Sequence, residues 1–114
     1  MYNQAEIQQS WINCADILLV RYEKLIVDEQ ATFKAIINYC GIEVNRLYLW
    51  NLVHNNSFVN VTGRKPGQED VMAHQRKGIA GDWKNYFTDK VKQSFKEKFG
   101  DVLIETGYET DMRW

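Results

Sequence analysis

Apolar residues recur at helical spacing along much of this chain. The clearest pattern follows Asp28 and Glu29, whose charges suit the positive end of a helix dipole. Apolar side chains then come at i, i+3, i+4 and i+7, namely Phe33, Ile36, Ile37 and Cys40. Gly41 follows, in the place where a glycine commonly ends a helix. The pattern predicts a helix from about residue 29 to residue 40.

Three further helices are predicted from weaker signals. Residues 3–14 can form a helix that places Ile7, Trp11 and Cys14 on one face. Asn45 is a suitable cap for a helix that runs to about Asn55. Thr88 is a suitable cap for the last helix, which we expect Gly100 to stop and whose apolar stripe is Val91, Phe95 and Phe99. Residues 102–108 are then expected to fold back onto the body.

One apolar segment, residues 17–22, has no helical periodicity. The run Ile-Leu-Leu-Val followed by Arg21 and Tyr22 is typical of a strand that is buried on both faces of a parallel sheet. Such a strand needs neighbours on both sides, and no second stretch of the chain predicts one. The fold class is therefore α/β, mostly helices around one buried parallel strand. The chain is either part of a larger domain or completes its sheet with another copy.

Composition narrows the class of protein. The 114 residues are enough for one domain, and the net charge of −1 gives no general attraction to nucleic acid or to an anionic membrane. No apolar run approaches the ~20 residues that span a bilayer, and the first residues lack a signal-peptide core. We expect a cytoplasmic protein. Cys14 and Cys40 are expected to be reduced thiols rather than a disulfide, and no metal site is predicted.

Residues 56–82 form a long loop with unusual chemistry. They hold four of the seven glycines and the one proline, and five basic residues lie between positions 64 and 84. Glycine lets backbone N–H groups approach an anion, while Arg offers a planar fork and Lys a point charge. The loop matches neither of the common glycine-rich phosphate motifs. From composition alone, the loop is either a local anion site or a solvated charged surface.

A specific string that begins inside this loop favours the anion site. Residues 76–85, Arg-Lys-Gly-x-x-Gly-Asp-Trp-Lys-Asn, resemble the signature of cytosolic-type sulfotransferases that use 3'-phosphoadenosine-5'-phosphosulfate (PAPS). Residues 20–25 resemble the strand end of that family, and residues 56–58 resemble its Ser-Phe segment. Residues 1–114 thus look like the C-terminal part of a P-loop-like three-layer sulfotransferase fold, in which loop 56–85 carries the 3'-phosphate motif.

The resemblance implies roles for individual residues. Arg76, Lys77 and the backbone of Gly78 would grip the 3'-phosphate of PAPS or of its product, 3'-phosphoadenosine 5'-phosphate (PAP). Tyr22 would contact the adenine, unless it only packs at the end of its segment. Ser57 would hydrogen-bond near the adenine. Phe58 would stack on it, the alternative being a side chain that only anchors the loop.

Five other residues receive structural or open interpretations. Trp83 is interpreted as a packing anchor for the loop. Asp82 and Lys84 are expected to brace the loop as an ion pair, worth under about 1 kcal/mol if exposed. His54 and His74 match no catalytic position of the family and are given no role.

The chain also departs from the family. The family's 5'-phosphosulfate loop, its catalytic His and its assisting lysine have no match here, so no catalytic residue is assigned and the chain alone is expected to be inactive. The resemblance implies transfer of a sulfuryl group from PAPS to a hydroxyl or amine of an acceptor that cannot be named. The alternative is a non-catalytic remnant that acts as a binding module. Self-association, or pairing with an N-terminal part, would cover the unpaired sheet edges.

Overall fold

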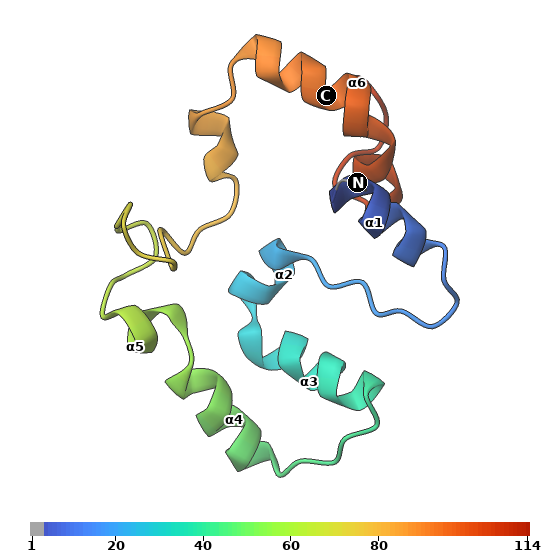
Figure 1. Ribbon diagram of the computed structural model, residues 1–114. Helices are drawn as coiled ribbons and strands as arrows, with labels where there is room; N and C mark the ends of the chain where they lie inside the picture. The colour runs from blue at the N-terminus through green and yellow to red at the C-terminus, as the bar shows by residue number, and fades with distance from the viewer. Residues whose placement is uncertain (1–3) are drawn as a thin grey trace. The chain divides into compact units, whose positions relative to one another are not determined.

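The computed structural model describes residues 4–114, and every regular element in that range is a helix (Figure 1). In chain order these are α1 (Gln4–Ile12), α2 (Tyr22–Val27), α3 (Glu29–Tyr39), α4 (Arg46–Asn55), α5 (Phe58–Thr62), the 3₁₀ helix η1 (Asp82–Asn85) and α6 (Asp89–Glu105). The chain forms two compact units. One holds residues 20–82, and the other holds the segments up to residue 19 and from residue 83.

The predicted buried strand is not found. Residues 17–21 are neither helix nor strand, and Tyr22 already begins α2. Leu18, Leu19 and Val20 expose 39%, 50% and 39% of their surface. A strand is held by hydrogen bonds to a neighbouring strand, and residues 4–114 supply none. The α/β expectation is therefore not met by this part of the chain, which is helical.

The unit of residues 20–82 keeps the local signals that the sequence predicts. The carboxylate of Asp28 accepts from the Ala31 N–H at 2.9 Å and caps α3. Gly41, with φ of +66°, ends the helix in a Schellman motif, in which the N–H of Gly41 donates to Asn38 and that of Ile42 to Ile37. These two bonds satisfy carbonyls that α3 would otherwise leave without a partner.

Helix α4 supplies the buried side chains of this unit. The Asn45 side chain accepts from the N–H groups of Leu47 at 2.8 Å and Tyr48 at 3.3 Å, so the predicted cap is confirmed. Leu49 and Val53 are buried on α4, which packs against α3. Cys40 lies at the end of α3 and Cys14 lies beyond α1, and both are free cysteines with exposed side chains. The predicted helix of residues 3–14 is observed as Gln4–Ile12, and residue 3 lies outside the described residues.

For helix α6, the predicted N-cap is confirmed and the predicted end is wrong. Thr88 caps it by accepting from the Val91 N–H at 3.4 Å, as predicted. The helix does not stop at Gly100 but continues to Glu105. Its end is a second Schellman motif around Gly107, with φ of +73° and bonds from Gly107 and Tyr108 to Ile104 and Leu103. Gly100 is instead a contact point within the helix.

The reason for a glycine at position 100 is the approach of Met112. A Cβ built on Gly100 would lie 2.5 Å from the Met112 Sδ and 2.7 Å from its Cε. Gly100 is buried, and Met112 belongs to the segment that returns along α6, where Lys96 Nζ donates to the Trp114 carbonyl at 3.1 Å. The predicted return of the chain thus occurs after residue 108, and the missing side chain makes room for it.

This contact predicts coupling between the two positions. Gly100→Ala should gain up to about 1 kcal/mol of helix propensity, but it must displace Met112. In a Met112→Ala background the gain should appear in full, because the obstacle is gone. Urea unfolding of the four proteins of this double-mutant cycle measures the difference. Equal effects of Gly100→Ala in both backgrounds would contradict the contact.

Candidate functional site

The loop after α5 is bent back on itself by backbone hydrogen bonds. Gly63 ends α5 with φ of +70° and turns the chain into the loop. The N–H of Gly67 donates to the Lys77 carbonyl at 2.8 Å, and the N–H of Asp70 donates to the Arg76 carbonyl at 3.0 Å. These bonds place Gly67 and Asp70 beside Lys77 and Arg76, which follow them in the sequence by ten and six residues.

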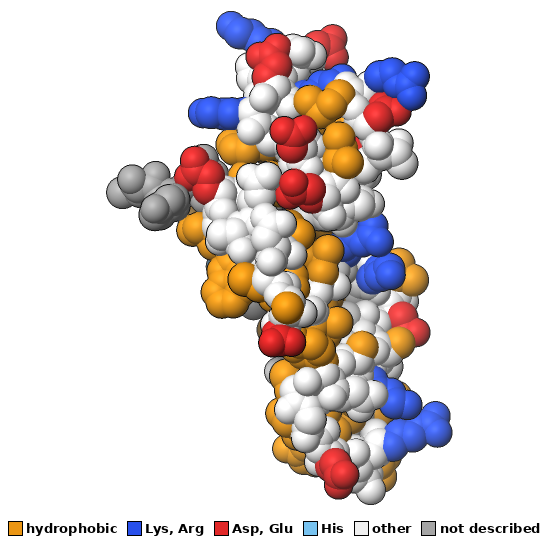
Figure 2. Space-filling view, turned by 90° about the vertical axis from the view of Figure 1, so that its right-hand side faces the viewer, with side chains coloured by type: hydrophobic (Ala, Val, Ile, Leu, Met, Phe, Trp, Pro, Cys, Tyr) orange, Lys and Arg blue, Asp and Glu red, His pale blue; other side chains and the backbone are white. Residues whose placement is uncertain are grey.

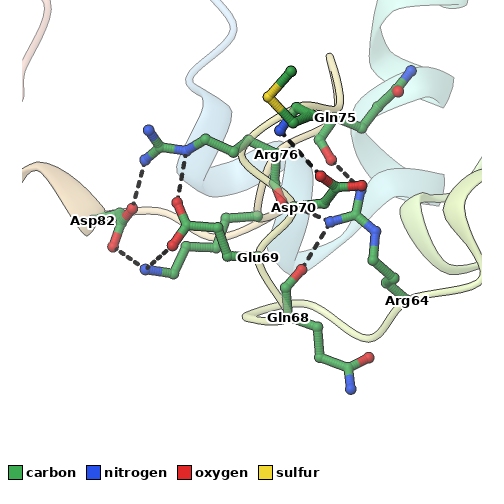
Figure 3. A network of polar contacts seen from close by, with 9 residues as sticks. Arg64, Gln68, Glu69, Asp70, Gln75, Arg76 and Asp82 are labelled. Carbon is green, nitrogen blue, oxygen red and sulfur yellow. Dashed lines mark hydrogen bonds and ion pairs between the residues drawn. The ribbon is translucent and has the colours of Figure 1, made fainter.

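Arg64 reinforces the same arrangement with its side chain (Figure 3). Its Nη1 donates to the carbonyls of Gln68 at 2.9 Å and Arg76 at 2.7 Å, and its Nη2 donates to the carbonyl of Gln75. One guanidinium thus bonds both sides of the loop. The sequence offered no signal for this role beyond the presence of a basic residue.

Arg76 and Lys77 lie in a cluster with two carboxylates (Figure 3). Arg76 Nε is 3.1 Å from Glu69 Oε1, and Arg76 Nη2 is 3.0 Å from Asp82 Oδ2. Lys77 Nζ is 2.7 Å from Asp82 Oδ1 and 4.0 Å from Glu69 Oε2. The Asp82 side chain is only 13% exposed and bonds both cations, whereas that of Glu69 is 30% exposed and lies farther from Lys77.

The expected ion pair of Asp82 with Lys84 is replaced by this cluster. Asp82 pairs with Arg76 and Lys77, because the folded loop brings those cations to it. The Lys84 Nζ lies 5.8 Å from the centre of the Trp83 ring. Trp83 itself packs edge-to-face on Phe87 at 5.3 Å, a residue outside the loop, so its role as an anchor for the loop stays a prediction.

Gly78 packs directly on Phe58. It has φ of +65°, and a Cβ at this position would lie 2.8 Å from the Phe58 ring. Arg64 also lies over that ring, with its Cζ 5.3 Å from the ring centre. Phe58 therefore packs against two residues of the loop, Arg64 and Gly78, as expected if its side chain anchors the loop. Adenine stacking on it stays a prediction.

A cavity of about 340 Å³ collects most of the predicted residues. It is lined by Tyr22, Phe58, His74, Gln75, Arg76, Lys77, Gly78, Ile79 and Asp82. Ser57 is not among these residues. It stands at the N-cap of α5, and its hydroxyl makes no capping bond. His74 lines the cavity although the sequence gave it no role, and its place two residues before Arg76 was the available signal. His54 instead stacks on Trp50 at 4.7 Å.

The donor set of this cavity fits a phosphate group. Arg76 and Lys77 supply charge-assisted donors, and Gly78 has the backbone that admits an anion most closely. Glu69 and Asp82 neutralise the two cations formally, with two carboxylates against two cations. A phosphate must therefore share donors with these carboxylates or replace one of them. Glu69 is the easier to replace, because it is more exposed and its contact with Lys77 is long.

A larger groove of about 870 Å³ lies along α3 and α4 and has both acidic and basic side chains, including Asp28, Lys34, Glu43 and Arg46. Within residues 4–114, no group of three or more His, Cys, Asp or Glu side chains could hold a metal ion. In the same residues, no helix is long and apolar enough to cross a membrane.

The chain is similar to sulfotransferases in two comparisons with known proteins. The family model described as "Sulfotransferase domain" matches residues 8–107. A "Flavonol sulfotransferase-like" protein of Flaveria bidentis is 30% identical over 80% of this chain and 34% of its own length. "Sulfotransferase 2A1" of Homo sapiens is 28% identical over 79% and 35%, and "Cytosolic sulfotransferase 3" of Arabidopsis thaliana is 29% identical over 75% and 32%.

No solved structure matches the chain. The chain spans about a third of the length of the curated relatives that it matches. The family model nevertheless covers most of the chain, including both the segment at Tyr22 and the loop around Arg76 and Lys77. The chain belongs to the sulfotransferase domain family.

Proposed function

We propose that this chain forms the 3'-phosphate and adenine side of a PAPS site in a sulfotransferase. The observation that carries the proposal is the convergence of Tyr22, Phe58, Arg76, Lys77 and Gly78 on one cavity. These residues come from three separate stretches of the sequence, and all of them belong to the unit of residues 20–82.

Each residue has a distinct part in the proposed site. The planar fork of Arg76 suits two phosphate oxygens, and its side chain is 47% exposed, which leaves room for a ligand. Lys77 adds a point charge beside it. Gly78, which lines the cavity, would offer its backbone N–H. Tyr22 and Phe58 present aromatic surface to the adenine, whose other contact is predicted to be the Ser57 hydroxyl.

The proposed reaction is sulfuryl transfer to a hydroxyl or amine acceptor. The bond between sulfur and the 5'-phosphate oxygen breaks, a bond from sulfur to the acceptor oxygen or nitrogen forms, the acceptor loses its proton, and PAP is released. PAPS supplies the activated sulfuryl group when it is bound. The residues of this chain would hold the nucleotide at its 3' end, so their contribution is positioning rather than proton transfer.

The exposed apolar surface supports a further part of the proposal. Leu18, Leu19 and Val20 are exposed. Figure 2 shows that further apolar side chains are exposed on the face in view. We propose that an N-terminal sulfotransferase part pairs with this chain and supplies the 5'-phosphosulfate and catalytic groups. We also propose that the protein works in the cytoplasm, as the name of the Arabidopsis relative says of that protein.

The first test is loss of PAP binding in Arg76→Ala/Lys77→Ala. Each charge-assisted bond contributes about 1.5–3 kcal/mol, so the dissociation constant should rise about a hundredfold or more. Calorimetry with PAP measures it, and AMP, which lacks the 3'-phosphate, should bind both proteins alike. Lys65→Ala/Lys90→Ala makes the same change of net charge and should keep the affinity for PAP. An unchanged affinity of the Arg76/Lys77 double variant would refute the site.

Gly78 provides a second test with a close control. Gly78→Ala and Gly81→Ala both place an alanine at positive φ, +65° and +75°, and should cost about 1–2 kcal/mol of backbone strain each. Only at Gly78 does the new Cβ meet another group, the Phe58 ring. Gly78→Ala should therefore weaken PAP binding at least about tenfold more than Gly81→Ala does. Equal affinities of the two variants would show that the Gly78–Phe58 contact does not shape the site.

The carboxylates give a third test of opposite sign. If phosphate competes with Glu69 for Arg76, then Glu69→Gln should bind PAP several-fold more tightly, because one competing charge is removed. Glu43→Gln makes the same charge change away from the cavity and should leave the affinity unchanged. Weaker binding by Glu69→Gln would mean that this carboxylate organises the cations and does not compete with the ligand.

A further inference from the structure

Arg64 has chemistry that the proposed site does not use. It is not among the residues that line the cavity, so it is not placed as a phosphate ligand. Its guanidinium instead makes three hydrogen bonds, all to backbone carbonyls, those of Gln68, Gln75 and Arg76. Arg64 thus has a different role from Arg76 and Lys77, although all three are basic residues of the same loop.

The three carbonyls come from both sides of the loop. Gln68 lies 4 residues after Arg64, whereas Gln75 and Arg76 lie 11 and 12 residues after it. The Arg76 carbonyl also accepts from the Asp70 N–H at 3.0 Å, and the next carbonyl, that of Lys77, accepts from the Gly67 N–H. The guanidinium and these two amides together hold the backbone at the residues whose side chains face the cavity.

The base of Arg64 is fixed as well. Its N–H donates to the Thr62 hydroxyl at 3.1 Å, and that hydroxyl donates to the Phe58 carbonyl at 2.6 Å. The guanidinium lies over the Phe58 ring, the same ring that Gly78 packs against. Arg64 therefore links α5, the Phe58 ring and the backbone of Gln75 and Arg76 in one connected set of contacts.

We propose that Arg64 is a positioning residue that holds the loop closed, so that Arg76 and Lys77 face the cavity. The inference rests on the proposed function for its consequence, the binding of PAP, but the hold on the loop can be measured without a nucleotide. Arg suits the task better than Lys, because its planar fork carries five donors in fixed directions and stacks on an aromatic ring. Without it, three carbonyl oxygens would converge with no cation between them.

The experiment uses Arg64→Lys, which keeps the charge but loses the fork. In the nucleotide-free chain, hydrogen exchange of the Gly67 and Asp70 amides, measured by NMR, should accelerate at least about tenfold. Exchange of the α3 and α4 amides should stay as in the wild type. The dissociation constant for PAP should rise about tenfold, with that for AMP unchanged. Arg46→Lys, the same substitution at the start of α4, is the control and should change neither quantity.

Three results would overturn the inference. Unchanged exchange at Gly67 and Asp70 in Arg64→Lys would show that Arg64 does not hold the loop. Faster exchange with unchanged PAP affinity would show that the hydrogen bonds of Arg64 do not position Arg76 and Lys77 for binding. Equal acceleration in the loop and in α3 and α4 would show a general loss of stability. If the wild type itself binds no PAP, the proposed function fails, while the exchange rates still decide whether Arg64 closes the loop.

Discussion

The candidate site depends on holding two cations, Arg76 and Lys77, side by side in one long loop. Like charges repel, and a flexible loop of glycines would let them separate. Glu69 and Asp82 oppose this repulsion by pairing with both, and Asp82 does so from a position that is largely protected from water. The same pairing limits the site, because an anionic ligand must compete with the carboxylates that assemble it. The free energy of phosphate binding is therefore the difference between the bonds that the cations make to the phosphate and the bonds that they make to Glu69 and Asp82.

The backbone beneath the cations is organised by a different kind of interaction. The loop has no regular secondary structure between Gly63 and η1 to satisfy its peptide groups. The Arg64 guanidinium and the amides of Gly67 and Asp70 take over that role. The ion pairs among the side chains and the hydrogen bonds of Arg64 to the backbone are thus separate sets of contacts, and Arg76 takes part in both.

Features that depend on neighbouring residues could be predicted from the sequence. The caps at Asn45 and Thr88 were predicted because a capping bond spans only two or three residues. Asp28 was placed at the start of α3 by its charge, and its capping bond is an addition from the structure. The loop that carries the sulfotransferase signature was found because that signature is one short string. Five of the six predicted binding residues line one cavity, although their binding roles stay predictions.

Features that depend on distant partners could not be predicted. Residues 17–22 have a strand pattern, but a strand exists only when another strand is present to pair with it. Gly100 was predicted to stop the last helix because glycine often ends helices. The actual reason for a glycine there is its contact with Met112, a tertiary contact that the local sequence does not indicate. The pairing of Glu69 with Arg76 follows from a fold of the loop that no periodicity indicates. Among the residues that the structure describes, only Leu49, Val53 and Val102 are buried apolar side chains, so much of the apolar surface still lacks a covering partner.

The central claim is that this chain recognises the 3' end of the nucleotide, and phosphorus NMR of PAP tests it most directly. The 3'- and 5'-phosphates of PAP give separate resonances. On addition of the chain, we expect the 3'-phosphate resonance to shift and saturate, while the 5'-phosphate resonance stays nearly unchanged. Equal perturbation of both resonances, or of neither, would contradict it.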